Sequence, residues 1–272
     1  MKRTLVFAMS VLGACGSAGR RGGNGDGGTD LGPGDDLESA QHDFALPLSA
    51  QFVYAHTYSD LYRLDPETSA IVKVASFGWP LGGTDMMTDL AIDKNGNMTG
   101  VSFKAIYAVD PDTAGCTLLS HFTGSFINGL SYLPIDGDAE ALVGTATNGD
   151  LFRIDPATGS TFKFGNFGGG LASSGDIMFV SGLGTYATVK VSGVATDSLA
   201  RIDPMTGGAT LVGDTGFSNL WGLGFWKDKL YGFTSDGKTL SISPMTGAAQ
   251  LLHTDTVSWY GAGVRTSAPV IQ

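Results

Sequence analysis

The sequence predicts an all-β fold, a five-bladed β-propeller, and two observations carry that prediction. The unit Asp-Pro-x-Thr-Gly, or a close variant, recurs five times, with its proline at Pro66, Pro111, Pro156, Pro204 and Pro244. Successive prolines are 45, 45, 48 and 40 residues apart, and a period in the forties built from short strands is typical of propeller blades. Short alternating apolar segments also flank each unit, as expected of strands on either side of a turn.

Each repeated unit is predicted to be a turn that leads into the outer strand of a blade. Proline fixes φ at the second position of the turn, and the closing glycine adopts a positive φ. The residue before proline can accept hydrogen bonds from the amides that follow it; these residues are Asp65, Asp110, Asp155, Asp203 and Ser243. Ser69 and Ala114 replace the glycine in the first two units, so those two turns are expected to be shifted or more strained.

The innermost strand of each blade is predicted to follow a longer loop. These strands are Thr88–Ile92, Asn128–Tyr132, Ser174–Phe179, Trp221–Phe225 and Tyr260–Val264, the third being the least regular. Glycine stands at the second place in four of them, where a missing side chain lets backbones approach one another around an axis. The domain opens with a strand at Phe52–His56 and closes with Gly261–Val264. Pairing of these two strands would close the ring, and a sixth blade would need about 40 further residues.

The N-terminus is predicted to be a targeting segment. A basic start, Met1-Lys2-Arg3, precedes an apolar stretch that is shorter than the roughly 20 residues of a membrane-spanning helix. It ends in Leu12-Gly13-Ala14-Cys15, which resembles the lipobox of bacterial lipoproteins, with Cys15 as the lipidated residue; an ordinary cleaved signal peptide is the alternative. We therefore divide the chain into a signal peptide at 1–14, a flexible Gly/Asp-rich tether at 15–47 and a propeller at 48–272. Gly16 gives no aspartate-type retention signal, which favours the outer membrane over the inner.

Composition and motifs exclude several classes of function. The net charge of -10 argues against nucleic acid as a partner. No Gly-x-Ser-x-Gly elbow, phosphate-binding loop or metal-spaced histidine pair occurs, so no catalytic residue, metal or cofactor is predicted. Asp93–Asn97 resembles the start of a calcium loop but lacks the glutamate at its twelfth position, and a hairpin turn is predicted instead. Cys116 is predicted to be a buried structural thiol, and the protein to be a monomer.

The mouth of the central channel is the predicted binding site. Trp221, Trp259 and Tyr260 enter two adjacent inner strands, and Asn128 and Asp89 lie at matching places on others. Aromatic side chains beside short polar groups in a concave site suit glycans or small organic ligands. We expect the three aromatic rings to stack on a ligand and the two polar residues to orient it. Packing of Trp221 and Trp259 between blades is the alternative. Trp79 and Asp85 lie on the corresponding loop of another blade.

The repeated units resemble those of secreted bacterial β-propeller lipoproteins that carry Asp-Pro-x-Thr-Gly turns, which are distantly similar to NHL and quinoprotein-type propellers. The resemblance covers about residues 50 to 265. It implies a lipid-anchored binding module of the cell envelope, with a glycan, a small molecule or an envelope protein as partner. Two alternatives stay open. One is a propeller enzyme, either a hydrolase of the lactonase kind or a cyclase, with a divalent cation at the channel mouth. The other is a purely structural surface protein.

Overall fold

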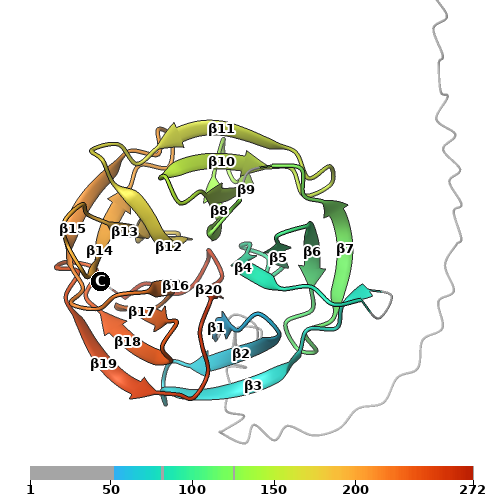
Figure 1. The fold of residues 1–272 in the computed structure, drawn as a ribbon, viewed down its shortest axis with the longest axis horizontal. Coiled ribbons are helices and arrows are strands. Elements are labelled where there is room, and N and C mark those ends of the chain that lie inside the picture. Colours follow the sequence, from blue (N-terminus) through green and yellow to red (C-terminus); the bar gives the residue numbers. More distant parts are fainter. Residues whose placement is uncertain (1–51, 81–82, 125, 272) are drawn as a thin grey trace, which may run out of the picture. The chain divides into compact units, whose positions relative to one another are not determined.

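A computed structural model describes residues 52–80, 83–124 and 126–271, which form five four-stranded antiparallel sheets arranged as a ring (Figure 1). The predicted five-bladed all-β propeller is thus confirmed. The segments predicted to be a signal peptide and a tether, with Cys15, lie outside the described residues. Within the described ranges, no helix has the length and apolar character needed to cross a membrane.

Blades are numbered from the start of the domain, and their strands run from the axis outward. Blade 1 is β20 (Gly261–Gly263), β1 (Val53–His56), β2 (Asp60–Asp65) and β3 (Ala70–Ser76). Blade 2 is β4 (Met87–Ile92), β5 (Met98–Ser102), β6 (Ala105–Val109) and β7 (Cys116–His121). Blade 3 is β8 (Gly129–Pro134), β9 (Glu140–Thr145), β10 (Asp150–Ile154) and β11 (Thr161–Asn166). Blade 4 is β12 (Ala172–Val180), β13 (Gly184–Lys190), β14 (Asp197–Ile202) and β15 (Ala209–Asp214). Blade 5 is β16 (Leu220–Trp226), β17 (Lys229–Thr234), β18 (Lys238–Ile242) and β19 (Ala249–Thr254).

The last strand of the chain closes the ring on the first. β20 pairs antiparallel with β1, with Tyr54 opposite Gly263 and His56 opposite Gly261. Blade 1 is therefore built from both ends of the domain, as the sequence predicted. Because β20 and β1 pair with each other, the edges by which they face one another are not exposed. Closure therefore removes a site where another chain could pair.

The repeated turns have the predicted geometry. The carboxylate of Asp110 accepts the backbone N–H groups of Asp112 and Thr113, both at 2.9 Å. Corresponding bonds form at the other three Asp-Pro turns, and at the fifth the Ser243 hydroxyl oxygen accepts the N–H of Thr246. The closing residue has a positive φ, which is 60° at Ser69 and 56° at Ala114. The strain expected at these two non-glycine positions is confirmed.

Inner-strand glycines allow the close approach that the sequence predicted. A Cβ atom added to Gly129 would lie 2.5 Å from the carbonyl oxygen of Gly175, and one on Gly175 would lie 2.5 Å from that of Leu220. One on Gly222 would lie 2.8 Å from the carbonyl carbon of Gly261. Real Cβ atoms do not come this near to backbone, so the five inner strands can share one axis only with glycine at these places.

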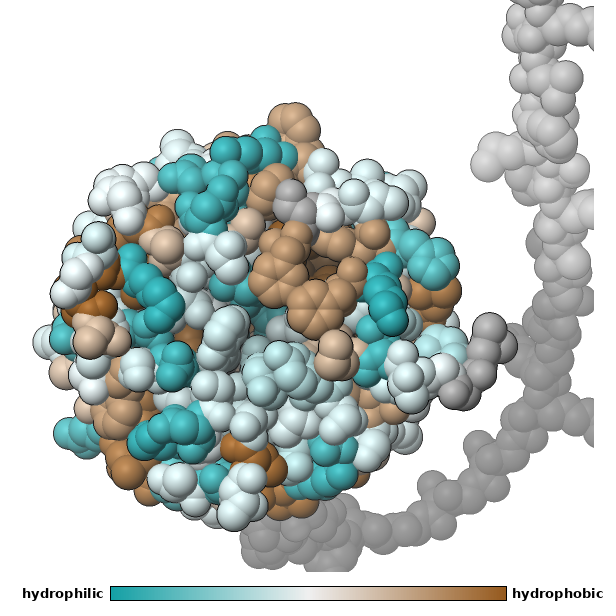
Figure 2. Space-filling model, viewed as in Figure 1, coloured by the Kyte–Doolittle hydropathy of each residue, from teal (hydrophilic) through white to brown (hydrophobic). Residues whose placement is uncertain are grey.

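The two faces of the ring differ in their loops. We call the face that carries the loops leading into the inner strands the mouth face; the hairpins between the second and third strands of each blade lie on it too. Figure 2 shows this face, with a brown, hydrophobic patch that is hollowed at its centre and lies beside the axis, over the part of the ring where β4 and β8 are labelled in Figure 1.

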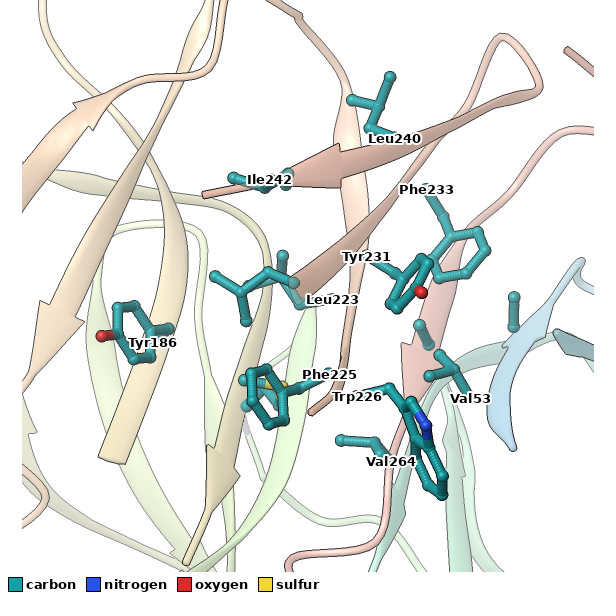
Figure 3. Packing of buried hydrophobic residues seen from close by; sticks show 14 of the residues in the cluster. Val53, Tyr186, Leu223, Phe225, Trp226, Tyr231, Phe233, Leu240, Ile242 and Val264 are labelled. Carbon is teal, nitrogen blue, oxygen red and sulfur yellow. The ribbon is translucent and has the colours of Figure 1, made fainter. Parts of the chain in front are cut away.

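Apolar side chains fill the space between adjacent blades. The largest cluster joins blade 5 to blades 4 and 1. In Figure 3, Trp226 of blade 5 lies beside Val53 and Val264, whereas the Phe225 ring lies on the other side of the strand, toward Tyr186 of blade 4. Trp259 belongs to the same cluster and is fully buried. Its ring meets Tyr62 and Phe233 edge to face, with centroid separations of 5.0 and 5.8 Å.

Residues 265–271, the C-terminal strap, cross the face opposite the mouth face. Their bonds reach four blades in turn: blade 2 at Ile92 (3.3 Å from the Thr266 amide), blade 3 at Glu140 (2.5 Å from the Thr266 hydroxyl), blade 4 at Ser181 (2.7 Å) and blade 5 at Lys227 (3.0 Å). The strap was not predicted from the sequence, because its contacts come from scattered single groups, among them backbone amides, the Thr266 hydroxyl and the Arg265 side chain.

Candidate functional site

The predicted channel-mouth residues do not all reach the surface. Trp221 and Tyr260 are half-buried, and Tyr260 stacks on Tyr58 with a centroid separation of 3.6 Å. Asn128 is 2% exposed, and neither its Oδ1 nor its Nδ2 has a hydrogen-bond partner among the described residues. Trp221 and Tyr260 are thus the two predicted residues that present a surface a ligand could touch.

Trp259 lies in the core, and its place corresponds to the alternative that the sequence left open. Its ring has no exposed area and packs between blades 5 and 1. An aromatic ring that is closed in on both sides cannot stack on a ligand that enters from solvent. We therefore leave Trp259 out of the candidate site and assign it to the packing of the blades.

Asp89 is also fully buried, and it forms a carboxyl pair with Asp176 at the axis. Asp89 stands at the inner-strand place where the other blades have glycine, and its side chain interacts directly with that of Asp176. Burial raises the pKa of both carboxyl groups well above the usual range, and the charge of Asp89 raises the pKa of Asp176 further. Because two like charges this close cannot both be stable without water, we assign one shared proton to the pair.

His56 lies beside this pair as a neutral ring. Its Nδ1 is 2.9 Å from the carbonyl oxygen of Thr57, so we assign the ring hydrogen to Nδ1. Nε2 then presents a lone pair to Oδ1 of Asp89 at 3.7 Å. Burial lowers the pKa of His56 to about 4. The contact is therefore one between a neutral imidazole and a protonated or shared carboxyl group, and it does not act as an ion pair.

The carboxyl pair lies among the inner strands, and its hydrogen bonds join β12 to β16. Oδ2 of Asp176, on β12, accepts the N–H of Leu223 on β16 at 2.7 Å. Asp89, on β4, accepts the N–H of Leu90 at 2.8 Å. The N–H groups of Leu130 on β8 and Ala262 on β20 lie near enough to Asp89 to oppose the rise of its pKa. We call Asp89, Asp176 and His56 the axial hub, and their burial gives them a role in holding the ring together.

A hollow with aromatic walls lies at blade 2, and we call it the blade 2 pocket. Trp79, from the β3–β4 loop, meets Tyr107 of β6 edge to face at 5.3 Å. Leu118 of β7 adds an apolar wall that is 40% exposed. The hollow measures about 240 Å³. Trp79 was predicted from the sequence to lie in a mouth loop, but Tyr107 and Leu118 come beside it only through the pairing of β6 with β7.

Polar groups also converge on the blade 2 pocket. Asp85 accepts the phenolic O–H of Tyr107 and the backbone N–H of Met86, each at 2.8 Å. Burial and this hydrogen bond to Asp85 raise the pKa of Tyr107, which keeps the phenol protonated. Lys104, in the turn between β5 and β6, and His121, at the end of β7, also line the hollow, and both are exposed.

The pocket continues into a second hollow of about 480 Å³ that shares Thr84, Asp85 and Lys104 with it. Phe103 lines this second hollow and stacks on Phe126 at 5.3 Å, with both rings nearly half exposed. Exposed aromatic pairs of this kind are uncommon away from binding surfaces. The hydrophobic patch in Figure 2 lies over this part of the mouth face.

Metal-binding geometry is not found among the residues that the structure describes. They contain no group of three or more His, Cys, Asp or Glu side chains arranged to hold a metal ion. Asp93, in the segment that resembles the start of a calcium loop, accepts the backbone N–H groups of Asn95 and Asn97 at 2.8 Å each, so its carboxylate caps the predicted turn. Cys116 is buried, and burial raises the pKa of its thiol to about 12.

Comparison with known proteins gives distant structural likeness only. No protein-family description and no curated protein sequence matches the chain. An auxiliary nutrient binding protein from Bacteroides thetaiotaomicron is 15% identical, with a TM-score of 0.46 over 78% of this chain and 61% of that one. An oligogalacturonate lyase from Vibrio parahaemolyticus is 14% identical, with a TM-score of 0.39 over 77% and 64%. A chain of a nidogen/laminin complex is 11% identical, with a TM-score of 0.46 over 78% and 97%. Likeness at this level carries no argument about ligand or chemistry.

Proposed function

We propose that this protein is a lipid-anchored binding module of the cell envelope whose mouth face takes a glycan or a small organic molecule. The observation that supports the proposal best is the blade 2 pocket, where Trp79 and Tyr107 stand beside Asp85, Lys104 and His121. A hollow with aromatic walls and a few convergent polar groups is the usual form of a small-molecule site. Aromatic rings pack against the C–H face of a sugar while the polar groups fix its orientation.

Replacement of Trp79 by alanine is expected to weaken ligand binding at least tenfold, because it removes the largest aromatic wall of the pocket. The measurement is a screen of immobilised glycans and soluble metabolites, followed by titration calorimetry with the compounds that bind. Trp221→Ala is the matched control, since Trp221 is a half-buried tryptophan on the same face but outside the blade 2 pocket. Circular dichroism and thermal unfolding check that both variants fold.

The two tryptophan variants also separate the two candidate positions on the mouth face. Loss of binding in Trp221→Ala alone would move the site to the channel mouth, where Tyr260 and Asn128 lie. If no compound of the screen binds, or if neither tryptophan variant weakens the binding, the proposal is contradicted. It would favour a structural surface protein, which is the alternative that needs no pocket.

Lipid attachment at Cys15 is expected to hold the protein on membranes, as the lipobox-like Leu12-Gly13-Ala14-Cys15 predicts. A bacterial cell fed an alkyne-labelled fatty acid should label the wild-type chain, and Cys15→Ser should lose the label and leave the membrane fraction. Cys116→Ser is the matched control, because Cys116 is the other cysteine of the chain and is buried in blade 2. Labelling that survives in Cys15→Ser would place the lipid elsewhere, and a wild-type chain that takes up no label would favour the ordinary cleaved signal peptide.

A further inference from the structure

Lys104 differs from most lysines of the described residues in its surroundings. Lys73, Lys94, Lys163, Lys190, Lys227 and Lys238 each form an ion pair with a carboxylate. Lys104 and Lys229 form none within the part of the chain that the structure describes, and Lys104 alone of the two lines the blade 2 pocket. In a chain of net charge -10, an ammonium group left without a carboxylate at a pocket wall is unusual.

The nearest carboxylate of the pocket already has other partners. Both oxygens of Asp85 accept hydrogen bonds, one from Tyr107 and one from Met86. No hydrogen bond or ion pair joins Asp85 to Lys104 among the described residues. The ammonium group of Lys104 and the imidazole of His121, on neighbouring strand ends, therefore both remain available to a ligand in the hollow.

The apolar walls and the volume limit what such a ligand can be. Trp79 and Leu118 provide an apolar surface on one side of the hollow, which suits the face of a ring. About 240 Å³ is below the roughly 300 Å³ at which pockets for drug-sized ligands begin, so the hollow beside Trp79 holds one ring, and a larger ligand would extend into the second hollow. No arginine lines the hollow, so the paired donors that favour phosphate or sulfate are lacking, and a lysine acts as a single point charge.

We infer that the blade 2 pocket binds a ring-shaped carboxylate, with the ring against Trp79 and Leu118 and the carboxylate on Lys104 and His121. The inference rests on the proposed binding function and names its ligand class. Sugar acids and aromatic acids share this chemistry, because each offers an apolar ring face and one negative group. A neutral sugar of the same shape would leave Lys104 without its partner.

Three probes and three variants test the inference by titration calorimetry with the full folded domain. The probes are methyl glucuronide, benzoate and the neutral methyl glucoside. The variants are Lys104→Gln, Trp79→Ala and, as the matched control, Lys163→Gln, which removes an exposed lysine of another blade. We expect at least one acid to bind about tenfold more tightly than methyl glucoside, and Lys104→Gln to remove about that factor, as for a charge-assisted hydrogen bond. Lys163→Gln should leave binding unchanged.

The outcomes separate this inference from the proposed function. Binding of the glucuronide but not of benzoate assigns a sugar acid, and the reverse result assigns an aromatic acid; either supports the inference. Equal binding of methyl glucoside, lost in Trp79→Ala but kept in Lys104→Gln, would overturn the anionic ligand and leave the binding function standing. If none of the three probes binds at about 10 mM, where even a millimolar Kd would be detected, the inference is overturned. The wider screen of glycans and metabolites would then still decide the proposed function.

Discussion

Deletion of residues 258–272 is expected to abolish cooperative unfolding altogether. It removes β20, which pairs with β1, and Trp259, which is buried between blades 5 and 1. Truncation of a buried tryptophan alone destabilises a protein by about 3–5 kcal/mol, and a whole domain is stable by about 5–15 kcal/mol. With the strand pairing lost as well, the remaining stability should be near zero. Differential scanning calorimetry of the truncated chain should show no sharp transition.

Two further truncations serve as controls for this result. Deletion of 16–45, the predicted tether, should leave the melting temperature unchanged. Deletion of 265–272 removes the C-terminal strap but keeps β20, and should lower the melting temperature without ending cooperativity, because single hydrogen bonds contribute about 1 kcal/mol each. Equal unfolding temperatures for the 258–272 and 16–45 deletions would contradict ring closure as the source of stability.

Loss of one carboxyl group from the axial hub is expected to have the next largest effect. Asp89→Ala removes the acceptor of the Leu90 N–H and leaves Asp176 without the group that shares its proton, and each buried polar group left without a partner costs about 1–3 kcal/mol. Asp89→Asn keeps an acceptor for the N–H of Leu90 and supplies an N–H to Asp176. Its stability near pH 5 should therefore lie close to that of the wild type, as measured by urea unfolding.

The same two variants differ from the wild type in their response to pH. The pKa of each hub carboxyl is raised in the folded state, so the folded protein holds more protons than the unfolded one above about pH 4. This contribution to stability is complete below that pH and is lost as the pH rises toward the folded-state pKa. The wild type should thus lose stability on the alkaline side, and Asp89→Asn should lose less. A wild-type stability that rises steadily from pH 5 to pH 9 would contradict the shared proton.

His56 acts in the opposite direction over a different interval. Its pKa is lowered from 6.5 to about 4, so the unfolded chain takes up a proton first as the pH falls. The stability that a neutral His56 contributes is present above pH 6.5 and is lost between pH 6.5 and about 4, a change on the order of 3 kcal/mol. Surface carboxylates with lowered pKa, such as Asp60 and Asp150, lose their contribution only below pH 4. The profile should therefore have a maximum, with His56→Gln flattening its acid side.

Local chemistry explains why the fold could be predicted from the sequence. A proline after Asp110 and a residue with positive φ at Ala114 define one turn, and five such turns spaced by 40 to 48 residues predict a ring of five blades. Gly129, Gly222 and Gly261 marked the inner strands because only close packing explains glycine at one place in each. These signals lie within a few residues of the structure they specify.

The candidate site depends on contacts between distant residues, and the sequence showed it only in part. Trp79 and Asp85 were noticed, but Lys104 and His121 reach the same hollow because β6 and β7 pair beside them. Trp259 was placed in the channel mouth because a strand sequence does not reveal which neighbour a side chain packs against. The one available sign of the axial hub was Asp89 at a glycine place; its partner Asp176 was hidden by the irregular register between Ser173 and Ile177.

The pairing of β20 with β1 also bears on how the protein is made. Val53–His56 is among the first segments of the domain to leave the ribosome or a translocation pore, yet its inner partner, Gly261–Gly263, is among the last. Blades 2 to 5 use neighbouring strands and can form in order as the chain emerges. Blade 1 must wait as an open three-stranded sheet. Synthesis or export that stalls late would therefore leave an almost complete protein with an exposed sheet edge, the form most prone to aggregate and most in need of a chaperone.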